Sequence, residues 1–294
     1  MPRRQSLTAR LGAYVALTKP RIIELLLITT LPTMIVAQRG LPPVWLMLAT
    51  LLGGALAAGG ANAINMVVDR DIDKLMHRTR KRPLVTGAVT PRNALIFAIT
   101  LEVVAFVELW SWVNLLSAAL AVSATLFYVF VYTLWLKRTS SQNIVIGGAA
   151  GAVPVLVGWA AVTDSLAWTP VVLFALIFVW TPPHFWALAV KYKEDYQAAS
   201  VPMLPAVATF KRTAREILVY SVVLVAVSLL LAPVANLGVI YVVSAVVLGA
   251  AFVGLAVRLL HRATPKAAMQ LFSYSITYLT VLFVLMAVDI FTKH

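Results

Sequence analysis

The sequence contains no cysteine, and charged residues make up only 12% of it. The missing cysteine excludes disulfides, thiolate catalysis, iron–sulfur clusters and cysteine-ligated zinc. The scarcity of charge excludes a soluble globular fold. The chain is 61% hydrophobic with a mean hydropathy of +0.91, whereas ordinary domains are about half apolar and about a quarter charged. We therefore predict a polytopic membrane protein. Basic cytoplasmic loops explain the net charge of +13, so we expect no nucleic-acid partner.

Apolar runs that approach the length needed to cross a bilayer, about 20 residues, recur along the whole chain. They lie near residues 22–38, 44–68, 94–111, 113–136, 144–162, 168–190, 217–235, 239–260 and 270–291. We therefore expect an all-α fold in which nine transmembrane helices form a single intramembrane domain over 1–294. A basic cytoplasmic tail, 1–20, precedes the first span.

The distribution of basic residues predicts the orientation of this bundle. With the N-terminus in the cytoplasm, every Lys and Arg except Arg39 and Lys293 falls on the cytoplasmic side, as the positive-inside rule requires. The C-terminus is then outside. The short tail favours a bacterial plasma membrane over an organelle. The polar loops discussed next would lie on the cytoplasmic face.

Acidic residues are the informative ones, because a carboxylate near hydrocarbon is unfavourable and usually functional. Two short clusters hold five of the 11 acidic residues: Asp69, Asp71 and Asp73 in the first, Glu194 and Asp195 in the second. Both follow a predicted span at its cytoplasmic end, four spans apart. This placement suggests an internal repeat or a shared site.

In the first cluster, Asn65, Asp69 and Asp73 recur every fourth residue, so a helix places them along one stripe. Asn62 falls near the same face, and Asp71 points elsewhere. Stacked carboxylates repel each other unless a cation lies between them. Oxygen-only ligands favour Mg²⁺, which proteins often hold through a few carboxylates together with substrate phosphates.

A dense basic run follows directly, with Arg78, Arg80, Lys81 and Arg82 within five residues. Carboxylates, Mg²⁺ and arginines together are typical of a site for a diphosphate, because Arg binds phosphate oxygens in bidentate fashion. The alternative is a positive-inside anchor, which applies most readily to Lys81. An anchor alone does not explain the neighbouring acids.

The second cluster predicts an opposing arm of the same site. Asp195 is the candidate carboxylate, and Lys191 lies one helical turn before it, where it could reach a phosphate. His184 lies about two turns deeper in an aromatic setting. A buried histidine is more often a core residue than a ligand, so from the residues alone its role stays open.

The spacing Asn65-x-x-x-Asp69-x-x-x-Asp73, followed by Arg78 and Arg82-Pro83, resembles the intramembrane prenyltransferases of the UbiA superfamily. Further segments bring the resemblance closer to the heme-farnesylating branch of that superfamily. They are Thr18-Lys19-Pro20-Arg21, Tyr132-Thr133 with Leu136-Lys137-Arg138, Asn143 to Gly148, Pro183-His184-Phe185-Trp186, and Asp195-Tyr196 with Val201 to Pro205. The match covers about residues 18–210.

The resemblance implies a nine-helix enzyme that transfers the farnesyl group of farnesyl diphosphate to a vinyl group of heme b. Water adds, and heme O and diphosphate are released. It implies Mg²⁺ as cofactor, the lipid bilayer as surroundings, and a heme A synthase or terminal oxidase assembly downstream. Lys191 stands one turn before Asp195, where many members carry a second aspartate, and this departure puts a symmetric two-magnesium site in doubt.

The resemblance also assigns roles to individual residues. The metal ligands would be Asn65, Asp69, Asp73 and Asp195. The catalytic residues would be Asp69, Asp73, Arg78, His184 and Asp195. Substrates would be bound by Asn62, Arg21, Arg80, Arg82, Lys137 and Lys191.

Two rival functions remain open at this stage. One is a related enzyme that prenylates an aromatic quinone precursor. The other is a membrane transporter, for which Glu102 near the middle of a predicted span is the main support, with Glu108 two turns on. Neither glutamate belongs to the motifs above.

Overall fold

The computed structural model describes residues 6–292, apart from the side chains of residues 21, 22 and 24–27. Within this range the fold contains helices and no strand, which confirms the all-α prediction. Eight helical segments are long and apolar enough to cross a membrane. They are α3 (Val44–Val68), α5 (Pro91–Trp112), the continuous segment Leu115–Thr139, α8 (Asn143–Thr163), α9 (Trp168–Lys191), α12 (Phe210–Val234), α13 (Val239–Arg262) and α14 (Pro265–Thr292). Each coincides with a predicted span.

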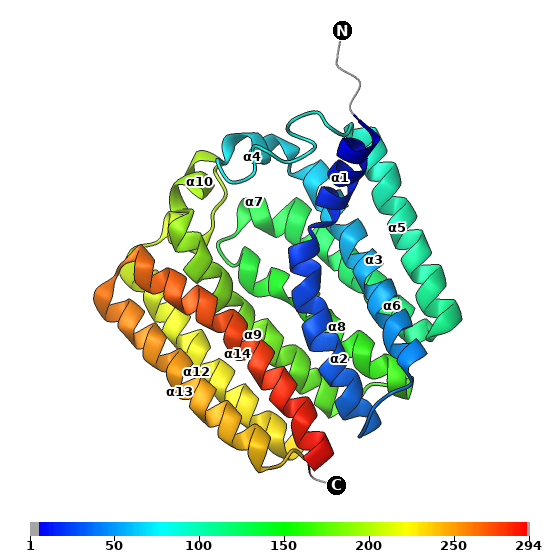
Figure 1. The fold of residues 1–294 in the computed structure, drawn as a ribbon. Helices are drawn as coiled ribbons and strands as arrows, with labels where there is room; N and C mark the ends of the chain where they lie inside the picture. The colour runs from blue at the N-terminus through cyan, green and yellow to red at the C-terminus, as the bar shows by residue number, and fades with distance from the viewer. Residues whose placement is uncertain (1–5, 293–294) are drawn as a thin grey trace.

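The first predicted span coincides with α2 (Pro20–Gln38). Its described apolar stretch is the shorter Ile28–Gln38, so nine crossings and the sides on which the termini lie stay predictions. Figure 1 shows that α1 and the end of α14 lie at opposite ends of the bundle.

The predicted basic tail contains a helix, α1 (Leu7–Thr18), which was not predicted from the sequence. Ser6 caps it by accepting a hydrogen bond from the Ala9 N–H at 3.2 Å. One face of α1 is buried through Ala13 and Leu17. The chain then turns at Lys19, whose left-handed backbone (φ 53°) separates α1 from α2. This turn directs the Lys19 side chain back toward α3.

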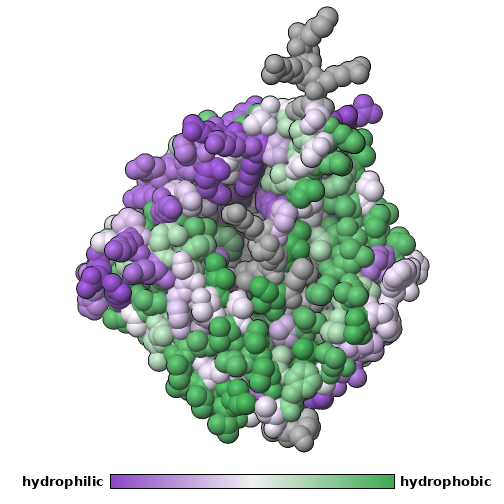
Figure 2. Space-filling view, in the orientation of Figure 1, coloured by the Kyte–Doolittle hydropathy of each residue, from purple (hydrophilic) through white to green (hydrophobic). Residues whose placement is uncertain are grey.

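Two transmembrane helices are each followed by a short helix after a break of one residue. Asp69 separates α3 from α4 (Arg70–Leu75), and Tyr192 separates α9 from α10 (Lys193–Ala198). Figure 1 places α4 and α10 at the same end of the bundle as α1. The hydrophilic surface gathers over this end in Figure 2, whereas much of the opposite half of this face is hydrophobic. We call this end the polar end.

The segment Leu115–Thr139 is not α-helical throughout. Between α6 (Leu115–Leu126) and α7 (Lys137–Thr139) it forms a π-helix, η1 (Phe127–Leu136). Thr133 Oγ1 donates to the carbonyl of Tyr128, five residues earlier, at 2.8 Å. The widened turn accommodates the Tyr132 ring against α8, where a Cβ on Gly147 would overlap that ring. π-Helical turns are rare and often mark functional sites.

The largest hydrophobic core joins α9 to α8, α12, α13 and α14. α9 is the most enclosed of the eight spans, because 56% of the residues in its apolar 18-residue stretch are buried. A short helix, α11 (Leu204–Val207), connects α10 to α12 at the polar end. Smaller cores join α3 to α1, α5, α6 and α8. The junctions after α3 and α9 therefore belong to helices of different hydrophobic cores but lie at the same end of the bundle.

Candidate active site

The α3–α4 junction carries a buried polar cluster of Asn65, Asp69 and Asp73, which we call the acidic cluster. Asp69 is fully buried. Its Oδ2 accepts hydrogen bonds from Lys137 Nζ and, at 2.7 Å, from Asn65 Nδ2. Its Oδ1 has no hydrogen-bond partner among the described residues, and Arg138 Nη2 lies 4.0 Å from it. A buried acceptor without a partner is rare in proteins, so this atom is a candidate ligand position.

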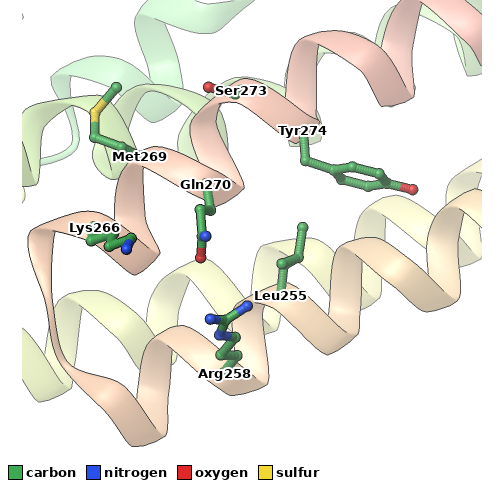
Figure 3. Close-up of a pocket in the computed structure, with 7 residues that line it drawn as sticks. All are labelled: Leu255, Arg258, Lys266, Met269, Gln270, Ser273 and Tyr274. Carbon is green, nitrogen blue, oxygen red and sulfur yellow. The ribbon is translucent and has the colours of Figure 1, made fainter.

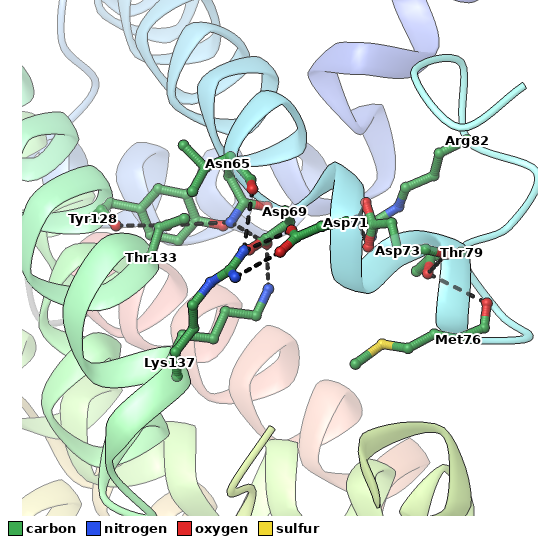
Figure 4. Close-up of polar contacts among 12 residues, drawn as sticks. Asn65, Asp69, Asp71, Asp73, Met76, Thr79, Arg82, Tyr128, Thr133 and Lys137 are labelled. Atoms are coloured by element: carbon green, nitrogen blue, oxygen red, sulfur yellow. Dashed lines mark hydrogen bonds and ion pairs between the residues drawn. The ribbon is translucent and has the colours of Figure 1, made fainter. Parts of the chain in front are cut away.

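Asn65 joins three segments at the cluster, and Figure 4 shows it beside Asp69 and Thr133. Its Oδ1 accepts a hydrogen bond from Lys19 Nζ at 2.8 Å. Its Nδ2 also lies 3.1 Å from Thr133 Oγ1 in η1, to which it donates. The α1–α2 turn, α3 and the π-helix therefore hold this amide in one orientation.

Asp73 forms an ion pair with Arg82, whose Nη1 donates to both carboxylate oxygens at 2.8 and 2.6 Å. Thr79 Oγ1 donates to the backbone carbonyl of Asp73 at 2.9 Å. The loop after α4 therefore folds back over the acidic cluster. Asp73 is 2% exposed, so Arg82 supplies most of the compensation that a buried carboxylate requires.

Asp71 points away from the acidic cluster. It accepts hydrogen bonds of 2.7 Å from both terminal nitrogens of Arg138. These hydrogen bonds lower the pKa of Asp71 to about 2. The same guanidinium donates to the Val68 carbonyl at 3.1 Å, so Arg138 fastens the end of α7 to the α3–α4 junction.

Asp195 joins the second predicted cluster to the basic loop that follows the first. Its two oxygens accept hydrogen bonds from the backbone N–H groups of His77 and Arg78 at 3.0 and 3.1 Å. The Arg78 guanidinium lies over the Tyr196 ring, 5.2 Å from its centroid, and donates to the Tyr196 hydroxyl at 3.2 Å. Burial raises the pKa of that hydroxyl, which keeps it protonated. The two sequence motifs therefore meet at the polar end.

The cluster suits Mg²⁺ in its chemistry, because Asn65, Asp69 and Asp73 offer oxygen donors and Asp69 Oδ1 lacks a partner. No group of three His, Cys, Asp or Glu side chains is arranged around a common point in the described part of the chain. Lys137 and Arg82 occupy the remaining carboxylate oxygens instead. Both cations carry charge of the sign that a diphosphate would attract.

Four of the predicted substrate-binding residues are not seen to join this cluster. Asn62 donates to the Thr18 carbonyl at 3.1 Å, Arg80 lies 2.9 Å from the His77 ring nitrogen, and Lys191 lies over the Tyr192 ring at 5.6 Å. Arg21 begins α2, and its side chain lies outside the described residues. Their roles in binding stay predictions.

His184 lies deeper in α9, about seven residues or roughly 10 Å along the helix before its C-terminal end. Its ring stacks on Trp180 with centroids 4.2 Å apart and packs against Phe272 of α14 at 4.7 Å. Its Nδ1 lies 2.6 Å from Ser275 Oγ. The ring is 6% exposed, so it forms part of the helix–helix interface below the polar end.

The two intramembrane glutamates lie on α5, outside these contacts. Glu102 accepts a hydrogen bond from Thr125 Oγ1 at 3.2 Å and packs where Gly60 of α3 leaves room for it. Both oxygens of Glu108 are buried without a hydrogen-bond partner among the described residues. Neither side chain is joined to the acidic cluster.

A shallow, open depression of about 510 Å³ lies between α13 and α14 (Figure 3). Its lining consists of Leu255, Arg258, Lys266, Met269, Gln270, Ser273 and Tyr274. None of the predicted site residues takes part in it, so it is separate from the acidic cluster.

Several buried polar residues and contacts were not predicted. Thr133, which contacts Asn65, was assigned no role. Lys137 was predicted to bind substrate, but its contact with Asp69 was not predicted, because the π-helix that precedes it has no clear sequence signal. Asn143, the first residue of α8, is fully buried with both side-chain polar atoms unpartnered among the described residues. Ser275 lies in a part of the chain where the sequence offered only hydropathy.

Known proteins resemble this chain in sequence over nearly its whole length. Residues 26–285 match the model of the UbiA prenyltransferase family. A protoheme IX farnesyltransferase of Renibacterium salmoninarum is 52% identical over 295 residues, covering 99% of this chain and 93% of the relative. Protoheme IX farnesyltransferase 1 of Saccharopolyspora erythraea is 57% identical over 282 residues, covering 95% of this chain and 90% of the relative.

Solved structures share the fold at low sequence identity. A digeranylgeranylglyceryl phosphate synthase superposes with a TM-score of 0.79 at 17% identity, covering 96% of this chain and 99% of the other. A UbiA homologue of Archaeoglobus fulgidus, bound to DMAPP and Mg²⁺, superposes with a TM-score of 0.64 at 16% identity, covering 92% and 99%.

Proposed function

The chain belongs to the UbiA prenyltransferase family, and from this premise we propose that it transfers the farnesyl group of farnesyl diphosphate to a vinyl group of heme b. The products are heme O and diphosphate. The observation that carries the proposal is identity of 52–57% over nearly the whole chain to proteins named protoheme IX farnesyltransferase. The ion-paired acidic cluster at the polar end agrees with a diphosphate substrate.

The proposed reaction starts with cleavage of the bond between farnesyl C1 and the diphosphate oxygen. Lys137 and Arg82 already neutralise Asp69 and Asp73. With substrate bound, they would turn part of this charge toward the leaving diphosphate. Fixed cations aimed at charge that grows in the transition state are usually the largest single contribution to catalysis.

Mg²⁺, when bound, would supply Lewis-acid stabilisation of the diphosphate oxygens. Asn65, Asp69 and Asp73 are the residues that would hold it, and Asp195 is the predicted opposite arm. Asp195 orders the loop at His77 and Arg78. Its proposed contribution is therefore to bring the arginine-rich loop over the diphosphate.

Cleavage leaves an allylic cation that must be shielded from water. The apolar interior of the bundle below the acidic cluster provides such surroundings, and the fifteen-carbon chain enters from the lipid. The vinyl group of heme b attacks C1 of the cation through its terminal carbon. The new positive charge, on the vinyl carbon next to the porphyrin ring, then takes up water and releases one proton. A hydroxyethylfarnesyl group results.

The site would act at the cytoplasmic face of a bacterial plasma membrane. A downstream heme A synthase or terminal oxidase assembly would receive the product. His184 lies about two helical turns below the polar end, where the porphyrin would be placed if the diphosphate lies at the acidic cluster. The aromatic rings around it suit a flat, apolar substrate.

Pigment analysis tests the proposal directly. The gene is expressed in a bacterial strain that lacks heme O synthase, and extracted hemes are separated by chromatography. We expect the more apolar heme O with the wild-type chain and none with Asp73→Ala. A parallel incubation of membranes with farnesyl diphosphate and either heme b or 4-hydroxybenzoate separates the two prenyltransferase functions. Prenylation of the benzoate alone would refute the heme assignment.

A further inference from the structure

Ser275 of α14 joins that helix to α9 through three hydrogen-bonding contacts. Its backbone carbonyl accepts a hydrogen bond from Trp180 Nε1 at 2.9 Å. Its hydroxyl donates to the carbonyl of Phe272, one turn earlier, at 2.6 Å. The same hydroxyl oxygen lies 2.6 Å from His184 Nδ1. Ser275 is fully buried, so no solvent competes for these bonds.

The two contacts of the Ser275 hydroxyl are both hydrogen bonds when the proton of His184 is assigned to Nδ1. A serine hydroxyl has one proton and two acceptor lone pairs. The Phe272 carbonyl has no proton to donate, so the hydroxyl proton lies on the bond to Phe272. With the hydroxyl proton on that bond, we assign the donor of the contact with His184 to Nδ1–H, which donates to Ser275 Oγ. In the neutral ring, Nε2 is left with a free lone pair.

The ring is also held in a fixed orientation. Trp180 stacks on it with an interplanar angle of 19°, and Phe272 packs beside it at 30°. Nε2 forms no hydrogen bond within the described residues, while Nδ1 is fully engaged. A histidine that donates one ring N–H to an oxygen partner and presents the other nitrogen unprotonated has the arrangement found in metal-ligating histidines.

We propose that Ser275 is a positioning residue that fixes His184 as the Nδ1–H tautomer, so that Nε2 ligates the iron of the heme substrate. The inference rests on the proposed function, because heme b must be the acceptor. Iron ligation would orient the porphyrin in the bundle and thereby present one vinyl group to the farnesyl chain. Ser275 itself would not touch the substrate.

The experiment titrates ferric heme b into the purified full-length chain in detergent and records the absorption spectrum. With the wild type we expect the bands of histidine-ligated heme. His184→Asn retains a donor where Nδ1 lies but lacks Nε2, so this spectrum should be lost while the fold persists. Ser275→Ala should weaken heme binding about tenfold, since partners of metal ligands contribute about 10- to 100-fold in affinity. The KM for farnesyl diphosphate should be unchanged.

Two further variants separate positioning from structural support. Ser275→Thr keeps the hydroxyl and should restore the wild-type spectrum. Ser228→Ala is the matched control. Ser228 is a fully buried serine whose hydroxyl donates to the Leu224 carbonyl at 2.8 Å and lies 2.6 Å from the hydroxyl of one tyrosine. Its backbone carbonyl accepts a hydrogen bond from the hydroxyl of a second tyrosine at 2.8 Å. It is not bonded to His184, so its loss should leave the heme spectrum unchanged.

The outcomes are distinct. The inference is overturned if folded Ser275→Ala binds heme with wild-type affinity and spectrum, if Ser228→Ala has the same effect as Ser275→Ala, or if His184→Asn keeps the wild-type bands. If the wild type farnesylates heme normally and one of these results is found, the inference alone fails. If the wild type does not farnesylate heme at all, the proposed function fails first.

Discussion

Both carboxylate oxygens of Asp73 accept hydrogen bonds from one atom, Nη1 of Arg82, at 2.8 and 2.6 Å. The two residues are nine apart in the chain, so this contact closes the loop after α4 over the acidic cluster. A guanidinium has five N–H donors, and the contact engages only Nη1. The same side chain can therefore hold Asp73 and bind a phosphate oxygen, which a single ammonium group does less well.

Arg82→Lys tests this double use. The variant keeps the charge near Asp73 but loses the planar set of donors, so kcat/KM for farnesyl diphosphate should fall by about 10- to 100-fold, the order of one or two lost charge-assisted hydrogen bonds. The KM for heme should stay within twofold. Initial rates with each substrate varied in turn measure both values. Arg92→Lys, an exposed arginine at the start of α5, is the matched control, and an equal loss there would refute the assignment.

Lys137→Met tests whether the acidic cluster binds Mg²⁺. Asp69 is fully buried, and removal of the partner of a buried charge destabilises a protein by about 3–5 kcal/mol. The melting temperature should therefore fall sharply without divalent cations, and Mg²⁺ should raise it more in the variant than in the wild type. A double variant, Asp69→Asn with Lys137→Met, should recover stability but not activity.

Thermal unfolding in detergent, with and without Mg²⁺, provides the measurement. Ca²⁺ and additional NaCl at matched ionic strength separate specific binding from charge screening. A melting temperature of Lys137→Met that does not respond to Mg²⁺ would argue against metal binding at Asp69.

Asn143→Leu should separate stability from function. A buried amide without partners destabilises the fold by about 1–3 kcal/mol, so an apolar side chain of similar size should raise the free energy of unfolding by about 1 kcal/mol. Residues retained at such a cost often serve a substrate. We expect turnover to fall at least tenfold. A variant that is more stable and fully active would show that Asn143 has no part in the reaction.

Trp159→Phe is the matched control on the same helix. Its indole nitrogen is also buried without a partner, but it lies 16 residues, or about 24 Å, farther along α8. Removal of this nitrogen should leave turnover unchanged, so activity assays on both variants isolate the effect of position.

The spans were predictable because the requirement is direct: a helix that crosses hydrocarbon must be about 20 residues long and apolar. The stripe of Asn65, Asp69 and Asp73 was predictable for a similar reason, since the helical repeat is known. The side chains that contact these three residues were not predictable from the sequence. Lys137 contacts Asp69, which lies 68 positions earlier in the chain. Lys137 directly follows a π-helix, which the sequence pattern does not predict.

Asp195 illustrates the same limit. Its presence at the site followed from its place after a span, but its contacts are to backbone N–H groups of a loop 117–118 residues away. Such contacts depend on how the loop after α4 returns, which local sequence does not determine. His184 was singled out, whereas its partner Ser275 was not, because a serine in an apolar helix usually bonds its own backbone.

Asp289 provides the test of a carboxylate that is structural rather than catalytic. It lies on α14, 1% exposed, and accepts hydrogen bonds from the N–H groups of Gly238 and Tyr241 at the start of α13. It thus caps a neighbouring helix, where a negative charge is favourable. Asp289→Asn replaces one acceptor oxygen by a donor, so it should destabilise the fold by about 1–2 kcal/mol and lower the melting temperature.

Because the α13 start lies at the opposite end of the bundle from α4 (Figure 1), turnover per folded molecule of Asp289→Asn should be unchanged. Asp164→Asn is the control, since Asp164 is exposed in a left-handed turn (φ 48°) that asparagine tolerates. Reduced turnover at an unchanged melting temperature in Asp289→Asn would instead place this residue in the reaction.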